Sequence, residues 1–193
     1  MTALLYGMLG FACIFLYDQN NLSHNNDRLE TLYVVGAGLL GLAYIDQIQY
    51  GLQLKQTIPM AVRVITGVLA LAFFVLLVYV SLVTGGRTNW RSKDKTSSRW
   101  WEKQLVTTGA YAFCRHPSVW ALTFFSLLLV PAVGFSLWYA ILFIAAGLLL
   151  ALYEDKRVFP QLMRGYDAYK KTTPFLFPNR ESIGRCFAGK KAK

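Results

Sequence analysis

The residues best suited to chemistry lie at the two ends of a hydrophobic stretch in the C-terminal half. Arg115, His116 and Pro117 stand just before this stretch, and Glu154 and Asp155 follow it. Pro117 suits the first turn of a helix, and a helix N-terminus presents free N–H groups and a positive dipole end. Together with an arginine and an imidazole, these groups would hold a carboxylate. The alternative is a membrane anchor made of basic residues.

The acidic pair offers the complementary charge. Glu154 and Asp155 would pair with an ammonium or accept ribose hydroxyls, and the alternative is ordinary solvation at a helix end. Acids at a helix C-terminus oppose the helix dipole, which favours the functional interpretation. A third segment, residues 166–178, combines tyrosines, lysines and two prolines. Its amphipathic pattern predicts that it folds back onto the membrane surface.

The composition indicates that these groups are positioned by membrane helices. Hydrophobic residues make up 55% of the 193-residue chain and charged residues only 16%, whereas about a quarter of the residues in a soluble domain are charged. A spanning helix needs about 20 apolar residues. The expected apolar helices cover residues 2–17, 29–52, 60–83, 117–132 and 135–153. We therefore predict an all-α integral membrane protein with about five transmembrane helices.

The charge distribution predicts the orientation of these helices. Only residues 131–136 separate the last two runs, so these runs form a tight helical hairpin. Most basic residues lie in two segments, 87–103 and 156–193, which flank this hairpin. The positive-inside rule makes both segments cytoplasmic, and counting back places the N-terminus outside. Nucleic-acid binding is the other interpretation of the net charge of +10, but both segments directly adjoin hydrophobic runs.

The chain thus divides into two functional parts. Residues 1–83 are expected to form three N-terminal transmembrane helices. Residues 84–193 are expected to form a catalytic half, made of a cytoplasmic loop, the hairpin and a cytoplasmic C-terminal segment. The first apolar run lacks a basic n-region and a cleavage site, so we expect it to be retained; a cleaved signal peptide is the alternative.

Other motifs carry weaker functional signals. Gly36, Gly38 and Gly41 match the G-x-G-x-x-G pattern, but they lie within an apolar run, which favours helix packing over dinucleotide binding. Asp46 is a candidate functional acid near the outer end of the second run, and an interfacial position is the alternative. The three cysteines fit neither a metal site nor a disulfide framework, and we predict no metal.

The ordered set of motifs in the C-terminal half resembles the isoprenylcysteine carboxyl methyltransferase family and its bacterial relatives, which are similar to phospholipid N-methyltransferases. The family pattern is Gly-x-Tyr, Arg-His-Pro, a hairpin, an acidic pair, Tyr-x-x-Tyr and two late prolines. The matching residues are Gly109, Tyr111, Arg115, His116, Pro117, Glu154, Tyr166, Tyr169, Pro174 and Pro178. The resemblance covers about residues 104–178.

This resemblance implies a cytoplasmic S-adenosyl-L-methionine site that opens toward the bilayer and receives a lipophilic methyl acceptor from the membrane lipids. The cofactor-binding residues that it implies are Gln104, Leu105, Val106, Tyr111, His116, Pro117, Ser118, Val119 and Glu154. The catalytic residues that it implies are Arg115, His116 and Glu154.

Departures from the family pattern bear on the acceptor. Val119 replaces a tyrosine, Asp155 replaces a glutamate, and Leu150 stands where prenylcysteine enzymes place a substrate-binding arginine. A buried carboxylate without a cationic partner is costly, so we expect a neutral or amine-bearing acceptor. An NADPH-dependent reductase similar to the sterol reductases, and a non-catalytic membrane scaffold, are the alternatives from other classes.

Overall fold

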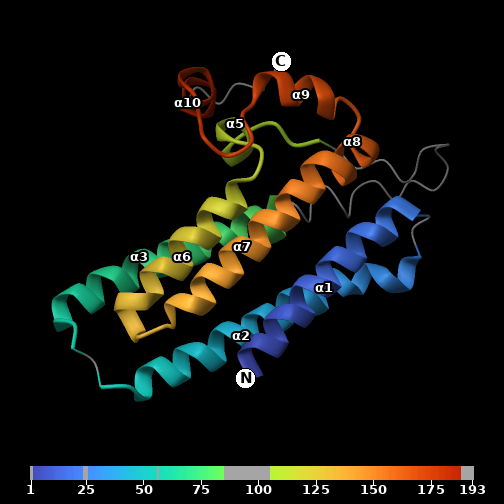
Figure 1. Ribbon diagram of the computed structural model, residues 1–193. Helices are drawn as coiled ribbons and strands as arrows, with labels where there is room; N and C mark the ends of the chain where they lie inside the picture. Colours follow the sequence, from blue (N-terminus) through green and yellow to red (C-terminus); the bar gives the residue numbers. More distant parts are fainter. Residues whose placement is uncertain (1, 24–25, 56, 85–104, 188–193) are drawn as a thin grey trace.

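Figure 1 shows the computed structural model, which describes residues 2–23, 26–55, 57–84 and 105–187. The elements of these ranges are α1 (Thr2–Ser23), η1 (Asp27–Thr31), α2 (Leu32–Gln53), α3 (Met60–Val78), η2 (Tyr79–Thr84), α5 (Ala110–Phe113), α6 (Pro117–Val133), α7 (Leu137–Tyr153), η3 (Glu154–Val158), α8 (Phe159–Leu162), α9 (Tyr166–Thr172) and α10 (Arg180–Phe187). Here η1 is a 3₁₀ helix, whereas η2 and η3 are π-helical. The prediction of an all-α fold is confirmed for these residues.

Four helical segments are long and apolar enough to cross a membrane: residues 2–23, 28–53, 60–81 and 137–162. The helix expected over 117–132 is present as α6, but it has only 17 residues. Large apolar side chains on these helices point outward, as for Val68 of α3, which is 63% exposed. An outward apolar face of this kind is typical of a helix that contacts lipid.

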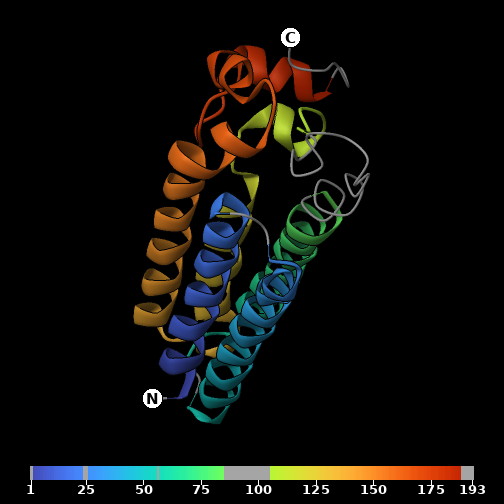
Figure 2. The same cartoon turned by 90° about the vertical axis from the view of Figure 1, so that its right-hand side faces the viewer.

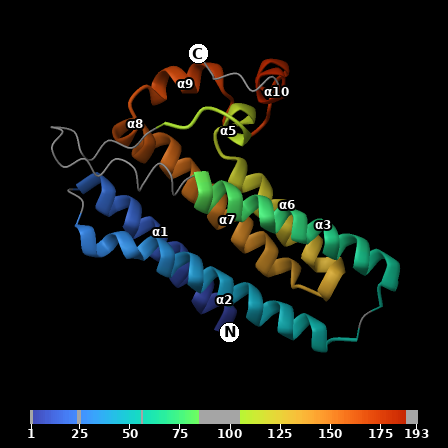
Figure 3. The same cartoon turned by 180° about the vertical axis from the view of Figure 1, so that it is seen from behind.

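The long helices form two groups that share one polar end. Helix α1 packs along α2, while α6 packs against both α3 and α7. Figures 1 and 3 show the N-terminus and the α2–α3 and α6–α7 connections at one end of the bundle. The short helices α5, α8, α9 and α10 gather at the other end, beneath the C-terminus in Figure 2. The Arg-His-Pro motif and the acidic pair therefore lie at this polar end.

The hairpin turn is shorter than predicted. Pro131 lies inside α6 rather than in the turn. Gly134 adopts a left-handed conformation with φ of 76°, and its N–H donates to the carbonyl of Val130 at 3.1 Å, while Phe135 donates to Leu129 at 3.3 Å. These two bonds satisfy the carbonyls of Leu129 and Val130 near the end of the helix. Because a left-handed glycine commonly ends a helix, Gly134 and not Pro131 ends α6.

The acidic pair does not lie at a helix end, contrary to the prediction. Beyond Tyr153 the chain continues through the π-helical segment η3 into α8. Glu154 and Asp155 therefore occupy a wide helical turn inside a continuous helical segment, where a free C-terminal dipole does not act on them. Single π-helical turns within α-helices frequently occur at functional sites.

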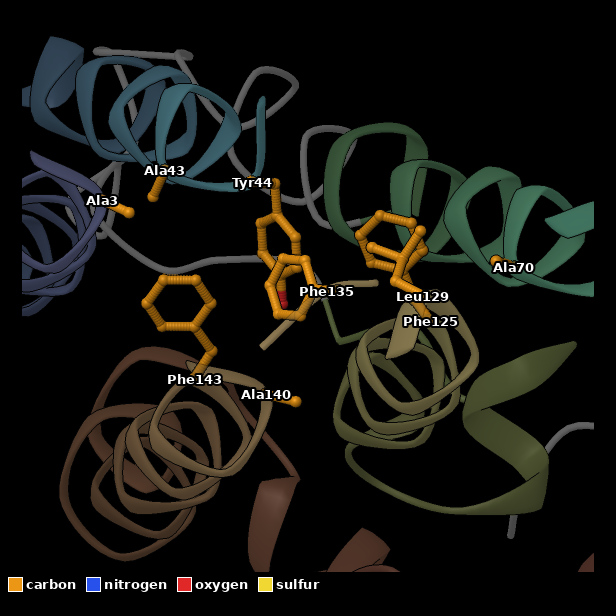
Figure 4. Close-up of a cluster of buried hydrophobic side chains, with 9 residues drawn as sticks. All are labelled: Ala3, Ala43, Tyr44, Ala70, Phe125, Leu129, Phe135, Ala140 and Phe143. Carbon is orange, nitrogen blue, oxygen red and sulfur yellow. The ribbon is translucent and has the colours of Figure 1, made fainter. Parts of the chain in front are cut away.

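An aromatic cluster joins α2 to the hairpin (Figure 4). The ring of Tyr44 packs against Phe125, Phe135 and Phe143, with centroids 5.0, 5.4 and 5.1 Å away. Its hydroxyl lies 2.6 Å from the Oγ of Ser126 in a hydrogen bond that either atom can donate. Because a buried hydroxyl without a partner is costly, this pair lets α2 bury a tyrosine against α6.

Candidate functional site

The Arg-His-Pro segment is fixed in place by the segment that follows α9. The backbone N–H groups of Arg115 and His116 donate to the carbonyls of Pro174 and Phe175, at 3.0 and 3.3 Å. Pro117, as the first residue of α6, needs no backbone partner for its nitrogen. The C-terminal segment thus orients the two side chains that the sequence singles out.

Asp155 is the centre of a buried polar network. It is 6% exposed, and its carboxylate lies 3.0 Å from Nε of Arg115 and accepts a 3.3 Å hydrogen bond from Nη2. The Tyr166 hydroxyl donates to Asp155 at 2.6 Å, and Lys170 Nζ lies 3.6 Å away. The sequence analysis singled out the Glu154–Asp155 pair, but it assigned only Glu154 to the cofactor-binding and catalytic residues. The charge of Asp155 is compensated by Arg115, from the segment before α6, and by Tyr166 and Lys170 of α9.

Arg115 is held by this network on one edge. Its Nη1 also donates to the carbonyl of Lys170 at 3.2 Å. A guanidinium carries five N–H donors, so Arg115 retains donors for a ligand while Asp155 and the Lys170 carbonyl fix its plane. This geometry suits the binding of a carboxylate.

His116 lies between the two carboxylates but stays neutral. Its Nδ1 is 3.7 Å from Glu154 and its Nε2 is 3.6 Å from Asp155. The side chain is buried, and its ring stacks on Phe159 at an angle of 11°. Burial lowers the pKa of His116 below its ordinary value, against the opposing effect of Asp155. The imidazole is therefore uncharged at neutral pH.

These groups border a cavity of about 140 Å³ at the polar end of the bundle, here called the polar cavity. The predicted site residues that line it are Leu105, Val106, Tyr111, Arg115, His116, Ser118 and Glu154. Pro117 is buried at the start of α6 and does not line it, and Gln104 lies outside the described residues. Val119 lines a neighbouring space instead.

Residues that the sequence analysis missed complete the wall of the polar cavity. Tyr17, Asp18 and Tyr33 come from the first two helices, which the resemblance does not cover. The signal for Asp18 was an acid next to an apolar run. Tyr169 also lines the cavity and donates to the carbonyl of Tyr111 at 2.6 Å, so it holds α9 against α5.

The neighbouring space is an apolar chamber of about 730 Å³, lined by α1, α2, α3, α6 and α7. Among the described residues that line it, Glu154 is the only one with a charged side chain, and Leu150 lies one helical turn before it. The chamber and the polar cavity have four lining residues in common, here called the junction: Tyr33, Ser81, Ser118 and Glu154. Polar and apolar ligands would therefore meet at this junction.

No protein-family model matches the chain, and no curated protein or solved structure matches it either. The chemical character of the two adjoining cavities is therefore the basis for a functional assignment.

Proposed function

We propose that this chain is an integral membrane S-adenosylmethionine-dependent methyltransferase that acts on a lipophilic acceptor, similar to the isoprenylcysteine carboxyl methyltransferases. The observation that carries this proposal is the junction between a polar cavity and an apolar chamber. A polar methyl donor and a lipid acceptor need such a pair of spaces, with their reacting atoms at the shared wall.

The residues of the polar cavity fit the chemistry of the cofactor. S-adenosylmethionine carries a carboxylate and an ammonium, and when bound it supplies a methyl group on a cationic sulfur. Arg115 would hold the carboxylate, and Glu154 would face a positive charge. The cavity is smaller than a typical ligand pocket of roughly 300–1,000 Å³. It therefore suits the charged end of the cofactor.

The contribution of the protein is to align the reactants and exclude water. Methyl transfer from a sulfonium needs no covalent enzyme intermediate, and positioning contributes about 7–11 kcal/mol in favourable systems. Asp155 fixes Arg115, and Glu154 and Tyr33 border both spaces at the junction. The apolar walls of the chamber keep the acceptor's reactive group out of bulk water, where charged reactants are strongly solvated.

The chamber favours a neutral or amine-bearing acceptor. Glu154 is the only charged side chain among its described lining residues, and Leu150 provides hydrocarbon where an arginine would neutralise a carboxylate. An anionic head group would be repelled by Glu154, whereas an ammonium would be attracted. The nitrogen of such a head group would accept the methyl group only after it loses a proton. A phospholipid N-methyltransferase is therefore the second candidate function.

We further propose that α1, α2, α3, α6 and α7 all span the bilayer and that the polar end faces the cytoplasm. Ser81 and Leu105, which come before and after the first basic segment in the chain, line the polar cavity at this end. The second basic segment includes the C-terminal helices α9 and α10, which also lie at this end. The orientation then follows from the positive-inside rule. The polar cavity would receive its cofactor from the cytoplasm, and the chamber would receive its acceptor from the membrane.

Titration of the purified protein in detergent with S-adenosylhomocysteine and with NADPH tests the proposal. We expect saturable binding of S-adenosylhomocysteine and none of NADPH. Binding of NADPH alone would indicate a membrane reductase, and binding of neither would indicate a scaffold. Each of these results contradicts the proposed function.

A further inference from the structure

The first two helices contribute an acidic and aromatic wall to the polar cavity. Asp18 of α1 is 4% exposed and lines this cavity beside Tyr17. Tyr33 of α2 packs against Tyr17, with ring centroids 5.4 Å apart, and extends the wall to the junction. The wall is therefore built from the half of the chain that lies outside the region of resemblance.

The charges around the polar cavity are separated by sign. Asp18 and Glu154 are the carboxylates among its described lining residues, and Arg115 is the cation, because the buried His116 is neutral. Arg115 belongs to the C-terminal half, where Asp155 fixes it. A ligand with one anionic group and one or more cationic centres is complementary to this arrangement.

Carboxylates and phenol rings together are suited to binding cations. Aromatic faces attract ammonium and other onium groups, more strongly when these groups are desolvated. Acids near the ends of membrane helices that face a cavity commonly serve a function. The wall therefore fits a cationic centre.

We propose that Asp18 is a cofactor-binding residue that binds the positive charge of the methyl donor, with Tyr17 and Tyr33 as the aromatic face beside it. This inference rests on the proposed function, since the donor is S-adenosylmethionine. It extends the cofactor site into the N-terminal helices.

Three probes that differ in charge test this proposal. S-adenosylmethionine has a sulfonium and an ammonium, S-adenosylhomocysteine has only the ammonium, and 5′-methylthioadenosine has neither. Their affinities are to be measured for the wild-type protein and for Asp18→Asn, which keeps the size of the side chain and removes its charge. Asp46→Asn is the matched control, because Asp46 lies near the opposite end of α2, where Thr2 donates to it.

We expect Asp18→Asn to weaken S-adenosylmethionine binding by about ten-fold or more, S-adenosylhomocysteine binding by the same factor or less, and methylthioadenosine binding not at all. Asp46→Asn should leave all three affinities unchanged. An equal loss for all three probes would show that Asp18 only supports the fold, and no loss would show that it does not bind the donor; both overturn the proposal. If the wild type binds none of the probes, the proposed function itself fails.

Discussion

At the scale of single residues, Glu154 and His116 connect the motif chemistry to the cavities. Glu154 borders both the polar cavity and the apolar chamber, and His116 is buried between Glu154 and Asp155. Glu154, at the junction, can act on both ligands. His116 is buried and acts by shaping the polar cavity. Both therefore affect cofactor binding, for different physical reasons.

Replacing either residue by alanine should weaken binding of S-adenosylhomocysteine. A hydrogen bond to a charged group contributes about 1.5–3 kcal/mol, so the expected loss of affinity for Glu154→Ala is about ten-fold or more. We expect a similar loss for His116→Ala, because it removes a side chain that lines the polar cavity. The measurement is a titration in detergent, with Asp46→Ala as the control. Unchanged affinity in both folded variants would contradict the site assignment.

The neutral state of His116 predicts a loss of stability in mild acid. Burial holds its pKa below the ordinary value, so below about pH 6.5 the unfolded chain binds a proton that the folded protein excludes. Stability should therefore fall as the pH decreases through this window, by up to about 1.4 kcal/mol per pH unit, and level off below the folded pKa. Thermal unfolding between pH 7.5 and 5 measures this dependence.

Removal of the buried imidazole provides the control for this pH dependence. His116→Gln should flatten the curve. A wild-type protein that is equally stable at pH 7.5 and 5 would show that His116 titrates in the folded state as it does in the unfolded chain.

At the scale of elements, close packing of the first two helices positions the acidic and aromatic wall. A Cβ atom on Gly36 of α2 would lie only 2.7 Å from the backbone oxygen of Gly10 of α1, whereas one on Gly38 would meet nothing within 4 Å. Gly36 and Gly38 both belong to the G-x-G-x-x-G pattern. Of these two, only Gly36 allows α1 and α2 to approach closely. The structure therefore agrees with the interpretation favoured from the sequence, in which this pattern serves helix packing rather than dinucleotide binding.

Gly36→Ala should destabilise the protein, because a backbone atom cannot move aside as a side chain can. We expect a loss of roughly 1–3 kcal/mol, as for other overpacked sites, together with weaker cofactor binding through displacement of Tyr33. Gly38→Ala, in the same helix, should be neutral or stabilising by up to about 1 kcal/mol. Thermal unfolding of both variants in one detergent makes the comparison. Equal stabilities would mean that α1 and α2 do not need this contact.

At the scale of the whole molecule, the two ends of the bundle differ in polarity. One end carries the N-terminus and the two turns, and the other carries the polar cavity and the short C-terminal helices (Figure 1). The proposed orientation and the proposed acceptor both depend on this difference. Each makes a prediction that does not require knowledge of the natural substrate.

Cysteine labelling in intact cells tests the orientation. In a variant without the three native cysteines, Ser92→Cys and Lys190→Cys should each be protected from a membrane-impermeant reagent, because both basic segments are cytoplasmic in the proposed topology. Thr2→Cys, at the opposite end, should be labelled. Labelling of positions 92 and 190 from outside would reverse the orientation and the compartment of the site.

The negative charge in the apolar chamber predicts which methyl acceptor the protein prefers. We expect the wild type to methylate acetyl-farnesylcysteine poorly and a phosphatidylethanolamine extract better, since Glu154 would face an unpaired carboxylate in the former case. Leu150→Arg should raise turnover of the farnesylcysteine by supplying a cation one turn from Glu154. Radiolabelled methyl transfer, read as base-labile methanol for the ester, is the measurement. Efficient turnover by the wild type would show that Leu150 is no barrier.

The sequence by itself determined the helical class and the approximate helix positions, because apolar runs of membrane length have few other structures available to them. It also placed the Arg-His-Pro motif and the acidic pair at one end of the hairpin, since a tight turn leaves both flanks on the same side. The lengths of the apolar runs and the positions of the motifs along the chain were sufficient for these conclusions.

The tertiary structure alone decided which residues share a cavity. Asp18 and Tyr33 are remote from Arg115 in the chain, and helix packing brings them to the same cavity wall. The π-helical segment turns Asp155 into a buried network while Glu154 faces the junction. Adjacent residues with the same chemistry thus acquire different roles, because burial and neighbours depend on helix packing that no local pattern specifies.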